Sequence, residues 1–188
     1  MHARTAAQGL AAALTATLTL VCQQAHAAPA APAGRTLAAR VVTYDAGASA
    51  EFRAAVDRGA AVWNESVDNV ELRPVAAGQR ADIRVLADDG WPRALPAALG
   101  RGTVYIGRQA VDQGYDTVRI SAHELGHILG LPDRKPGPCT SLMSGSSAGV
   151  ACRNPYPDAA EKAEVEADFG AAAPSRPAGV PHGAPIVD

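Results

Sequence analysis

Three residues between positions 123 and 127 have the types and spacing of a metal site. His123 and His127 are four residues apart, so on a helix they lie on one face, and both imidazoles can bind the same zinc ion. Glu124 follows the first histidine and can take a proton from an attacking water molecule. The pattern H-E-x-x-H therefore predicts a zinc site with Glu124 as general base.

The residues after His127 predict a third ligand. Gly130 can adopt a left-handed conformation and end the helix, and Pro132 disfavours its continuation. The chain can then turn back and bring the Asp133 carboxylate to the metal. Three protein ligands with one open position are typical of a catalytic zinc site. A bare H-E-x-x-H also occurs by chance in ordinary helices, and this extension argues against chance.

Apolar spacing and turn residues predict the elements that must position this site. Runs of β-branched residues predict four strands, and helical spacing predicts three helices around the metal motif and on either side of it. The expected strands are 39–44, 70–74, 82–86 and 102–107, and the expected helices are 49–66, one starting at Asp116 or Thr117, and 157–169. Because Pro92 and Pro96 interrupt residues 88–100, we expect a loop there.

The two ends of the chain have the composition of processing segments. Residues 1–27 combine Arg4, an apolar run from Leu10 to Val21 and the sequence Ala25-His26-Ala27, which predicts a secretory signal peptide. Residues 28–39 are expected to be a short propeptide or linker. Residues 40–172 form the predicted catalytic domain, and the Pro- and Ala-rich residues 173–188 are expected to be a disordered tail. We therefore expect a secreted, extracellular protein with no membrane association after processing.

Removal of the signal peptide would leave two cysteines, Cys139 and Cys152. A secreted chain with two cysteines favours one disulfide bond between them. The alternatives are free thiols or a second metal site, which would need further ligands, and His182 is the only other histidine after the predicted signal.

The charge balance argues against nucleic acid as a partner. The formal net charge is −2, and no basic stretch stands out. No segment indicates an oligomer, so we expect a monomer with protein or peptide substrates.

These motifs together resemble the snapalysin family, which comprises small extracellular neutral zinc proteases of the metzincin-like type. The resemblance extends from Val41 to Gly170 and is carried by H-E-x-x-H-x-x-G-x-x-D and by four further stretches. These are Ala50-Glu51-Phe52, residues 61–67, Gly137-Pro138-Cys139 and Leu142-Met143-Ser144-Gly145. It implies an α/β (α+β) domain with a twisted mixed sheet of four or five strands, two or three helices, and a Met-turn at Met143 beneath the zinc ion. A core methionine is the alternative for Met143.

The resemblance also implies roles for other segments. Residues 102–107 would be the sheet edge that receives the substrate, and a calcium ion would lie before the metal helix, near Asp116 and the backbone of Val118. An N-cap role for Asp116 is the alternative. An aromatic residue, commonly tyrosine, is expected soon after the ligand Asp133, but Arg134-Lys135-Pro136 stands there. This departure puts in doubt the family's preference for an aromatic residue after the cleaved bond.

The function predicted from these residues and the resemblance is a secreted zinc-dependent endopeptidase with one zinc ion per chain. Casein-type proteins are the expected substrates. Two alternatives use the same residues: a secreted zinc-binding protein without catalysis, and a zinc amidase acting on cell-wall peptides. The intact Glu124 argues against the first, and the lack of a recognisable wall-binding module argues against the second.

Overall fold

The computed structural model describes residues 38–170 together with Ile186 and Val187. The predicted signal peptide, and most of the predicted propeptide and tail, lie outside the described residues. No helix in the described part of the chain is both long enough and apolar enough to cross a membrane.

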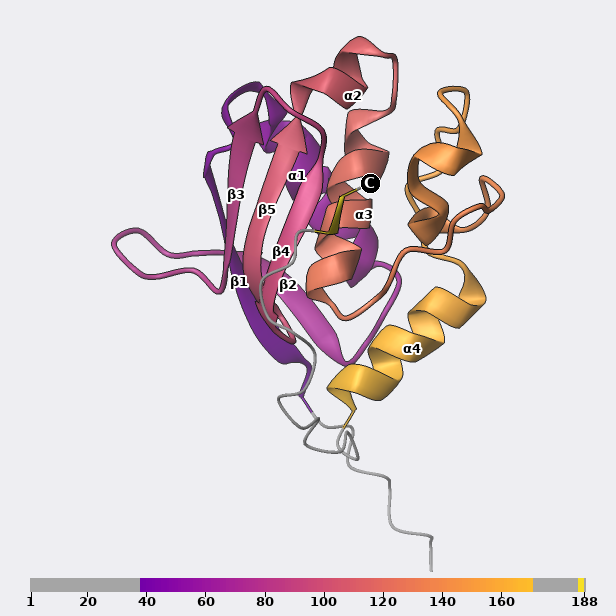
Figure 1. The fold of residues 1–188 in the computed structure, drawn as a ribbon. Helices are drawn as coiled ribbons and strands as arrows, with labels where there is room; N and C mark the ends of the chain where they lie inside the picture. Colours follow the sequence, from indigo (N-terminus) through magenta and orange to yellow (C-terminus); the bar gives the residue numbers. More distant parts are fainter. Residues whose placement is uncertain (1–37, 171–185, 188) are drawn as a thin grey trace, which may run out of the picture. The chain divides into compact units, whose positions relative to one another are not determined.

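A mixed sheet forms one layer of the fold (Figure 1). Its strand order is β2-β1-β3-β5-β4-β6. The neighbouring strands β1 and β2, β1 and β3, and β3 and β5 are parallel, whereas β4 is antiparallel to β5 and to the short β6. The strands are β1 (Arg40–Ala48), β2 (Val70–Pro74), β3 (Ile83–Asp88), β4 (Arg93–Ala98), β5 (Arg101–Gly107) and β6 (Ile186–Val187). The predicted α/β class with a mixed sheet is confirmed.

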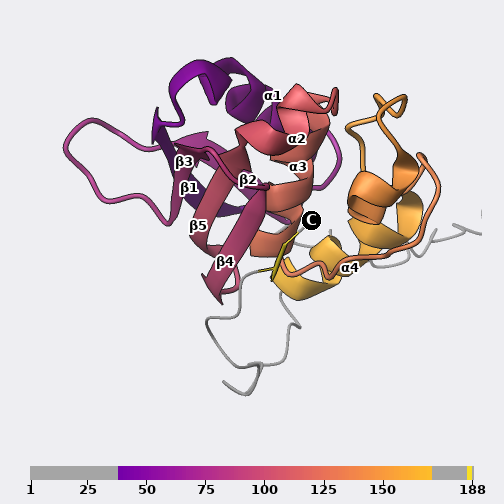
Figure 2. The same ribbon diagram turned by 45° about the horizontal axis from the view of Figure 1, so that its top comes forward.

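Helices cover one face of the sheet and build the C-terminal part of the domain. The helices are α1 (Arg53–Asn64), α2 (Arg108–Asp112), α3 (Thr117–Ile128) and α4 (Ala159–Phe169), with short 3-10 segments η1 (Ala50–Phe52) and η2 (Leu142–Ala148). The helices α1, α3 and α4 correspond to the three predicted ones. In both views α4 and the orange segment containing η2 lie on the side of α3 away from the sheet (Figures 1 and 2). The helix α3 is therefore the centre of the domain.

The core lies between the sheet and the helices α1 and α3. Along β1 the side chains of Val42, Tyr44 and Ala46 are buried while their neighbours are more exposed, so only one face of this strand meets the core. Trp63 of α1 is fully buried and donates a hydrogen bond from Nε1 to the Ala122 carbonyl oxygen of α3, at 2.8 Å. This bond fixes α3 against α1.

Gly59 allows α1 and α3 to approach each other closely. A Cβ atom placed on Gly59 would lie 2.9 Å from the backbone nitrogen of Ala122, which is closer than real Cβ contacts. Any larger residue at position 59 would push the two helices apart. The glycine thus sets the position of the metal helix relative to the rest of the core.

The structure corrects the expectation for residues 88–100. They contain a turn followed by β4, which pairs with β5 along most of its length. Pro96 lies within β4, where the strand deviates from regular pairing between Pro96 and Ala98. Proline is tolerated in strands that lie at a sheet edge or at a bulge, so its presence did not exclude a strand.

The new strand also changes which strand forms the edge. β5, which was expected to be the exposed edge, lies between β3 and β4 and is internal. The side of β4 away from β5 is the outer edge of the five long strands, and Ile186 and Val187 pair there with Ala94 and Arg93. The substrate-edge prediction for residues 102–107 is therefore wrong, because the proline-containing segment forms an additional strand.

Candidate active site

Helix α3 carries the metal motif and is almost entirely buried. Asp116 caps its N-terminus by accepting a hydrogen bond from the Arg119 backbone nitrogen at 2.9 Å. Every residue from Arg119 to Ile128 is buried. A helix packed on all sides presents its side chains rigidly, as a metal site requires.

Helix α3 ends just before Gly130, as predicted from the sequence. Gly130 has a φ of +108°, in the left-handed region. The Gly130 nitrogen donates to the His127 carbonyl oxygen at 3.1 Å, and the Leu131 nitrogen donates to the Gly126 carbonyl oxygen at 3.0 Å. This pair of bonds is a Schellman motif. It reverses the chain direction and returns Asp133 to the two histidines.

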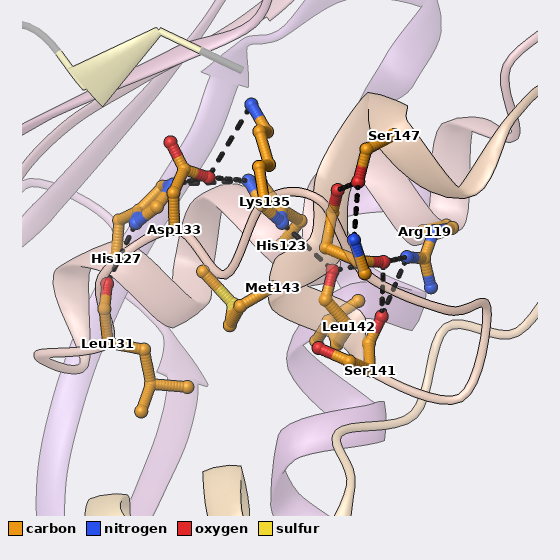
Figure 3. Close-up of polar contacts among 12 residues, drawn as sticks. Arg119, His123, His127, Leu131, Asp133, Lys135, Ser141, Leu142, Met143 and Ser147 are labelled. Atoms are coloured by element: carbon orange, nitrogen blue, oxygen red, sulfur yellow. Dashed lines mark hydrogen bonds and ion pairs between the residues drawn. The ribbon is translucent and has the colours of Figure 1, made fainter.

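Three ligand atoms meet beside α3 (Figure 3). The Nε2 atoms of His123 and His127 are 3.1 Å apart, and they lie 3.4 and 3.6 Å from Oδ1 of Asp133. Tetrahedral zinc with bonds of about 2.0–2.1 Å requires ligand atoms roughly 3.3–3.4 Å apart. Within the described part of the chain, this is the only group of three or more His, Cys, Asp and Glu side chains close enough to share an ion.

The hydrogen bonds of the two histidines support a bound cation. Nδ1 of His123 lies 3.0 Å from the Leu142 carbonyl oxygen, and Nδ1 of His127 lies 2.8 Å from the Leu131 carbonyl oxygen. A carbonyl oxygen only accepts, so each Nδ1 carries a proton and donates it. In the neutral rings both Nε2 atoms then present lone pairs to each other and to the Asp133 carboxylate. Such a set of electron pairs fits a divalent cation between them.

The electrostatics of Asp133 favour its ionised form. Burial by itself would raise the pKa of Asp133, but when the histidines are protonated the hydrogen bond from His123 and the charges of His127, His123 and Lys135 outweigh it and lower the pKa below its ordinary value. A carboxylate must be ionised to bind a metal. The surroundings of Asp133 thus suit it as a ligand.

Glu124 lies on α3 next to the first histidine and is fully buried. Its charge is felt by Arg93 of β4: hydrogen bonds to Asp88 are the main reason that the pKa of Arg93 is raised, and the charges of Tyr105 and Glu124 add to the effect. The Arg93 guanidinium also stacks over the Tyr105 ring, 4.0 Å from its centroid. The contacts of Arg93 attach it to Asp88 of β3 and to Tyr105 of β5.

Met143 lies beneath the three candidate ligands (Figure 3), and its assignment as a Met-turn stays a prediction. It is fully buried, and a Cβ placed on Gly126 would lie 2.9 Å from the Met143 sulfur. The glycine between the two histidines therefore makes room for the methionine. The Arg134 nitrogen donates to the Met143 carbonyl oxygen at 2.7 Å, which connects this turn to the loop that carries Asp133.

The predicted disulfide between Cys139 and Cys152 is present, and it encloses the segment with Met143. Loop closure of this length contributes about 3 kcal/mol in the chain-entropy model. The disulfide braces the segment beneath the ligands.

Two buried charged residues support the site and were not found from sequence. Glu161 of α4 accepts hydrogen bonds from Ser141 Oγ and from the backbone nitrogens of Leu142 and Met143, at 2.6, 3.0 and 2.9 Å. Arg119 of α3 donates to the carbonyl oxygen of Leu142 at 3.2 Å. Because the partners are distant in sequence, only the charge at buried helical positions could have indicated them.

The structure shows an N-cap role for Asp116, one of the two residues proposed for calcium. Asp116 caps α3, and its second carboxylate oxygen lies 3.7 Å from Arg153 Nη1. Val118 lies in the first turn of the same helix. The N-cap alternative for Asp116 is observed, and the calcium site remains a prediction.

The two basic residues after Asp133 point in different directions. Arg134 pairs with Glu164 of α4 at 2.5 Å. Lys135 instead extends toward the metal ligands, and its Nζ lies 3.6 Å from Oδ1 of Asp133 (Figure 3). Lys135, unlike Arg134, is therefore part of the site.

Comparison with known proteins agrees with this geometry. Residues 39–171 match the family model described as the Streptomyces extracellular neutral proteinase (M7) family. The chain is 43% identical to the extracellular small neutral protease of Streptomyces caespitosus over 128 aligned residues. The alignment covers 67% of this chain and 94% of that protein. The chain is 42% identical over 127 residues to the protein of the same name from Streptomyces coelicolor, covering 66% of this chain and 57% of that protein.

The matched region contains the sheet, α3, the three converging ligands and the disulfide. The resemblance noted from the motifs is confirmed over nearly the whole described domain. The chain belongs to the Streptomyces extracellular neutral proteinase (M7) family of secreted zinc metalloproteases.

Proposed function

We propose that this chain is a zinc endopeptidase whose metal is held by His123, His127 and Asp133. The observation that carries the proposal is the triangle of two Nε2 atoms and one carboxylate oxygen beside the fully buried Glu124. Zinc, when bound, acts as a Lewis acid on the carbonyl of the bond to be cleaved. Family membership favours peptide-bond cleavage over the amidase and the non-catalytic alternatives.

Glu124 moves the proton in this reaction. Its carboxylate accepts a proton from the attacking water as the oxygen–carbon bond forms, and it returns the proton to the leaving nitrogen as the carbon–nitrogen bond breaks. Because Glu124 is fully buried, its charge is poorly screened by solvent, which strengthens its effect on the water molecule. No other residue of α3 has a carboxylate next to the ligands.

The substrate backbone pairs with the outer edge of β4 in this proposal. An exposed strand edge binds an extended peptide through main-chain hydrogen bonds, largely regardless of its side chains. Arg93 and Ala94 on this edge are the positions that already pair with β6. This mode of binding suits casein-type substrates, which are loosely folded proteins.

A small pocket beside His123 has room for about one water molecule, so the side chain after the cleaved bond would enter it only if its lining moved. It is lined by Tyr115, Asp116, Arg119, Ile120, His123 and Gly145. The aromatic preference expected from the resemblance can be tested there. Matched peptides with phenylalanine or alanine at this position should differ in kcat/KM, and equal values would remove the preference.

The decisive experiment is casein hydrolysis by the purified protein with and without a zinc chelator. We expect the chelator to abolish cleavage and added zinc to restore it, because the three ligands are needed to hold the metal. Activity that persists in the chelator while bound zinc falls to zero would overturn the proposal.

The variant Glu124→Gln tests the assigned base. It preserves the side-chain volume and removes the proton acceptor, so kcat should fall by about 10²–10⁴-fold. The fold and the zinc content should stay the same, which circular dichroism and metal analysis would check. Glu164→Gln, on the surface of α4, is the matched control and should keep full activity. Wild-type turnover in Glu124→Gln would show that another group is the base.

A further inference from the structure

Lys135 lies beside the three candidate metal ligands. Its side chain is only 26% exposed, and its ammonium lies 3.6 Å from Oδ1 of Asp133. The same oxygen lies within 3.6 Å of both histidine Nε2 atoms. The residue as a whole is exposed, and its side chain reaches over the ligands in Figure 3.

The backbone on both sides of Lys135 is held in place. The Arg134 nitrogen donates to the Met143 carbonyl oxygen at 2.7 Å, and the Gly137 nitrogen donates to Ser147 Oγ at 3.0 Å. Both bonds connect the loop to the segment beneath the site. Lys135 is therefore presented by a fixed backbone, as a pre-organised charge requires.

A cation in this position is unfavourable for metal binding alone. The Lys135 ammonium shares the negative charge of Asp133 and repels a second cation held by the same carboxylate. The neighbouring cation, Arg134, does not face the ligands, because it pairs with Glu164 on α4. Pairing with Asp133 helps to keep that carboxylate ionised, and a further role for Lys135 would need an anion that forms near the ligands during the reaction.

Peptide hydrolysis produces such an anion. Attack of water on the scissile carbonyl places negative charge on the carbonyl oxygen, and fixed positive groups at that point lower the barrier. We propose that Lys135 is a catalytic residue whose ammonium donates a hydrogen bond to the carbonyl oxygen of the scissile bond. Glu124 transfers the proton of the water to the leaving nitrogen, so the contact with Lys135 requires no proton transfer. This role rests on the proposed peptidase function.

The test compares Lys135→Met with Arg134→Met. Both variants replace a long cation by an apolar chain of similar length, but only Lys135 faces the ligands. Three experiments use the full chain. The first gives kcat and KM on a fluorogenic peptide at saturating zinc, and the second gives zinc affinity by competition with a chromophoric chelator. The third measures inhibition by a phosphinic peptide that mimics the tetrahedral intermediate.

For Lys135→Met we expect kcat to fall on the order of 100-fold, as for the loss of one oxyanion donor. KM should change little, and the affinity for the phosphinic peptide should fall in parallel with kcat. Zinc affinity should stay equal or increase, because the repelling charge is gone. Arg134→Met should match the wild type in all three.

Two results would overturn the role of Lys135. A kcat in Lys135→Met close to that of the wild type would exclude a direct catalytic contact. A loss of zinc affinity as large as the loss of activity would show that Lys135 only supports the ligand loop. A wild-type chain that binds zinc and cleaves no protein would instead overturn the peptidase function itself, so the two failures are distinguishable.

Discussion

One buried carboxylate, that of Glu161, holds the segment beneath the metal ligands in place. It accepts hydrogen bonds from the backbone nitrogens of Leu142 and Met143. The carbonyl oxygen of Leu142 in turn accepts the Nδ1 proton of His123. The position of one ligand ring therefore depends on a residue of α4, two hydrogen bonds away. Such indirect support commonly matters as much for metal affinity as the ligands do.

Replacing Glu161 by alanine should destabilise the fold and weaken zinc binding. The variant leaves two buried backbone N–H groups and the Ser141 hydroxyl without this acceptor. Each unsatisfied group costs roughly 1–3 kcal/mol, so we expect a total loss of about 3 kcal/mol or more. Zinc affinity should fall by about 10–100-fold, because the partner of His123 becomes mobile. Urea unfolding and chelator competition measure the two effects.

The control for Glu161 is Glu164→Ala on the same helix. Glu164 is about one-third exposed and pairs with Arg134. A pair of this kind contributes no more than about 1 kcal/mol. Equal stability of the two variants would show that the hydrogen bonds of Glu161 do not support the fold.

At the scale of elements, β4 both packs against α3 and forms the edge to which β6 is attached. Asp88 and Arg93 form an ion pair across the turn before β4, and their hydrogen bonds lower the pKa of Asp88 to about 2. The antiparallel pairing of β6 covers β4 at Arg93 and Ala94. A peptide substrate and β6 would therefore use the same backbone groups.

Weakening the pairing of β6 should increase activity on extended peptides. The double variant Ile186→Pro/Val187→Pro removes two backbone N–H groups, so it should free the edge and raise kcat/KM several-fold. The double variant Ile186→Ala/Val187→Ala keeps the backbone groups and is the matched control. Unchanged kcat/KM in the proline variant would mean that β6 does not compete with substrate.

At the scale of the whole molecule, the site joins two parts of the domain. The sheet and α1 support α3 from one side, while the segment after Asp133 supports it from the other (Figure 1). The second part is also attached through Glu166 of α4, whose carboxylate accepts from the Asn69 backbone nitrogen at 3.0 Å. A metal bound by α3 and by Asp133 would add a further link between α3 and this segment.

Removal of the metal should therefore lower the thermal stability. Zinc at about 100 times its Kd stabilises a folded state by about 2.7 kcal/mol, because the unfolded chain lacks the assembled site. For a domain of this size we expect the chelator to lower Tm by about 10 °C. In His127→Ala the same chelator should have little effect. A wild-type Tm that is independent of chelator would contradict a zinc ion held at this position.

Local chemistry explains why much of the site could be predicted from the sequence. The spacing of His123 and His127 needs only the period of a helix, and the return of Asp133 needs only a glycine that ends it. The pairing of Cys139 with Cys152 followed from their number. These predictions depend on residues close together in the chain, so tertiary contacts could not change them greatly.

Features that depend on contacts between residues distant in sequence were decided only by the tertiary structure. Pro92 and Pro96 favour a loop where β4 lies, and the formation of β4 depends on pairing with β5. The supporting roles of Glu161 and Arg119 arise because α3 and α4 both contact the segment around Met143. Lys135 and Arg134 are adjacent and chemically alike, yet one meets Asp133 and the other meets Glu164. That difference depends on which elements pack against the loop, so it cannot be predicted from the local sequence.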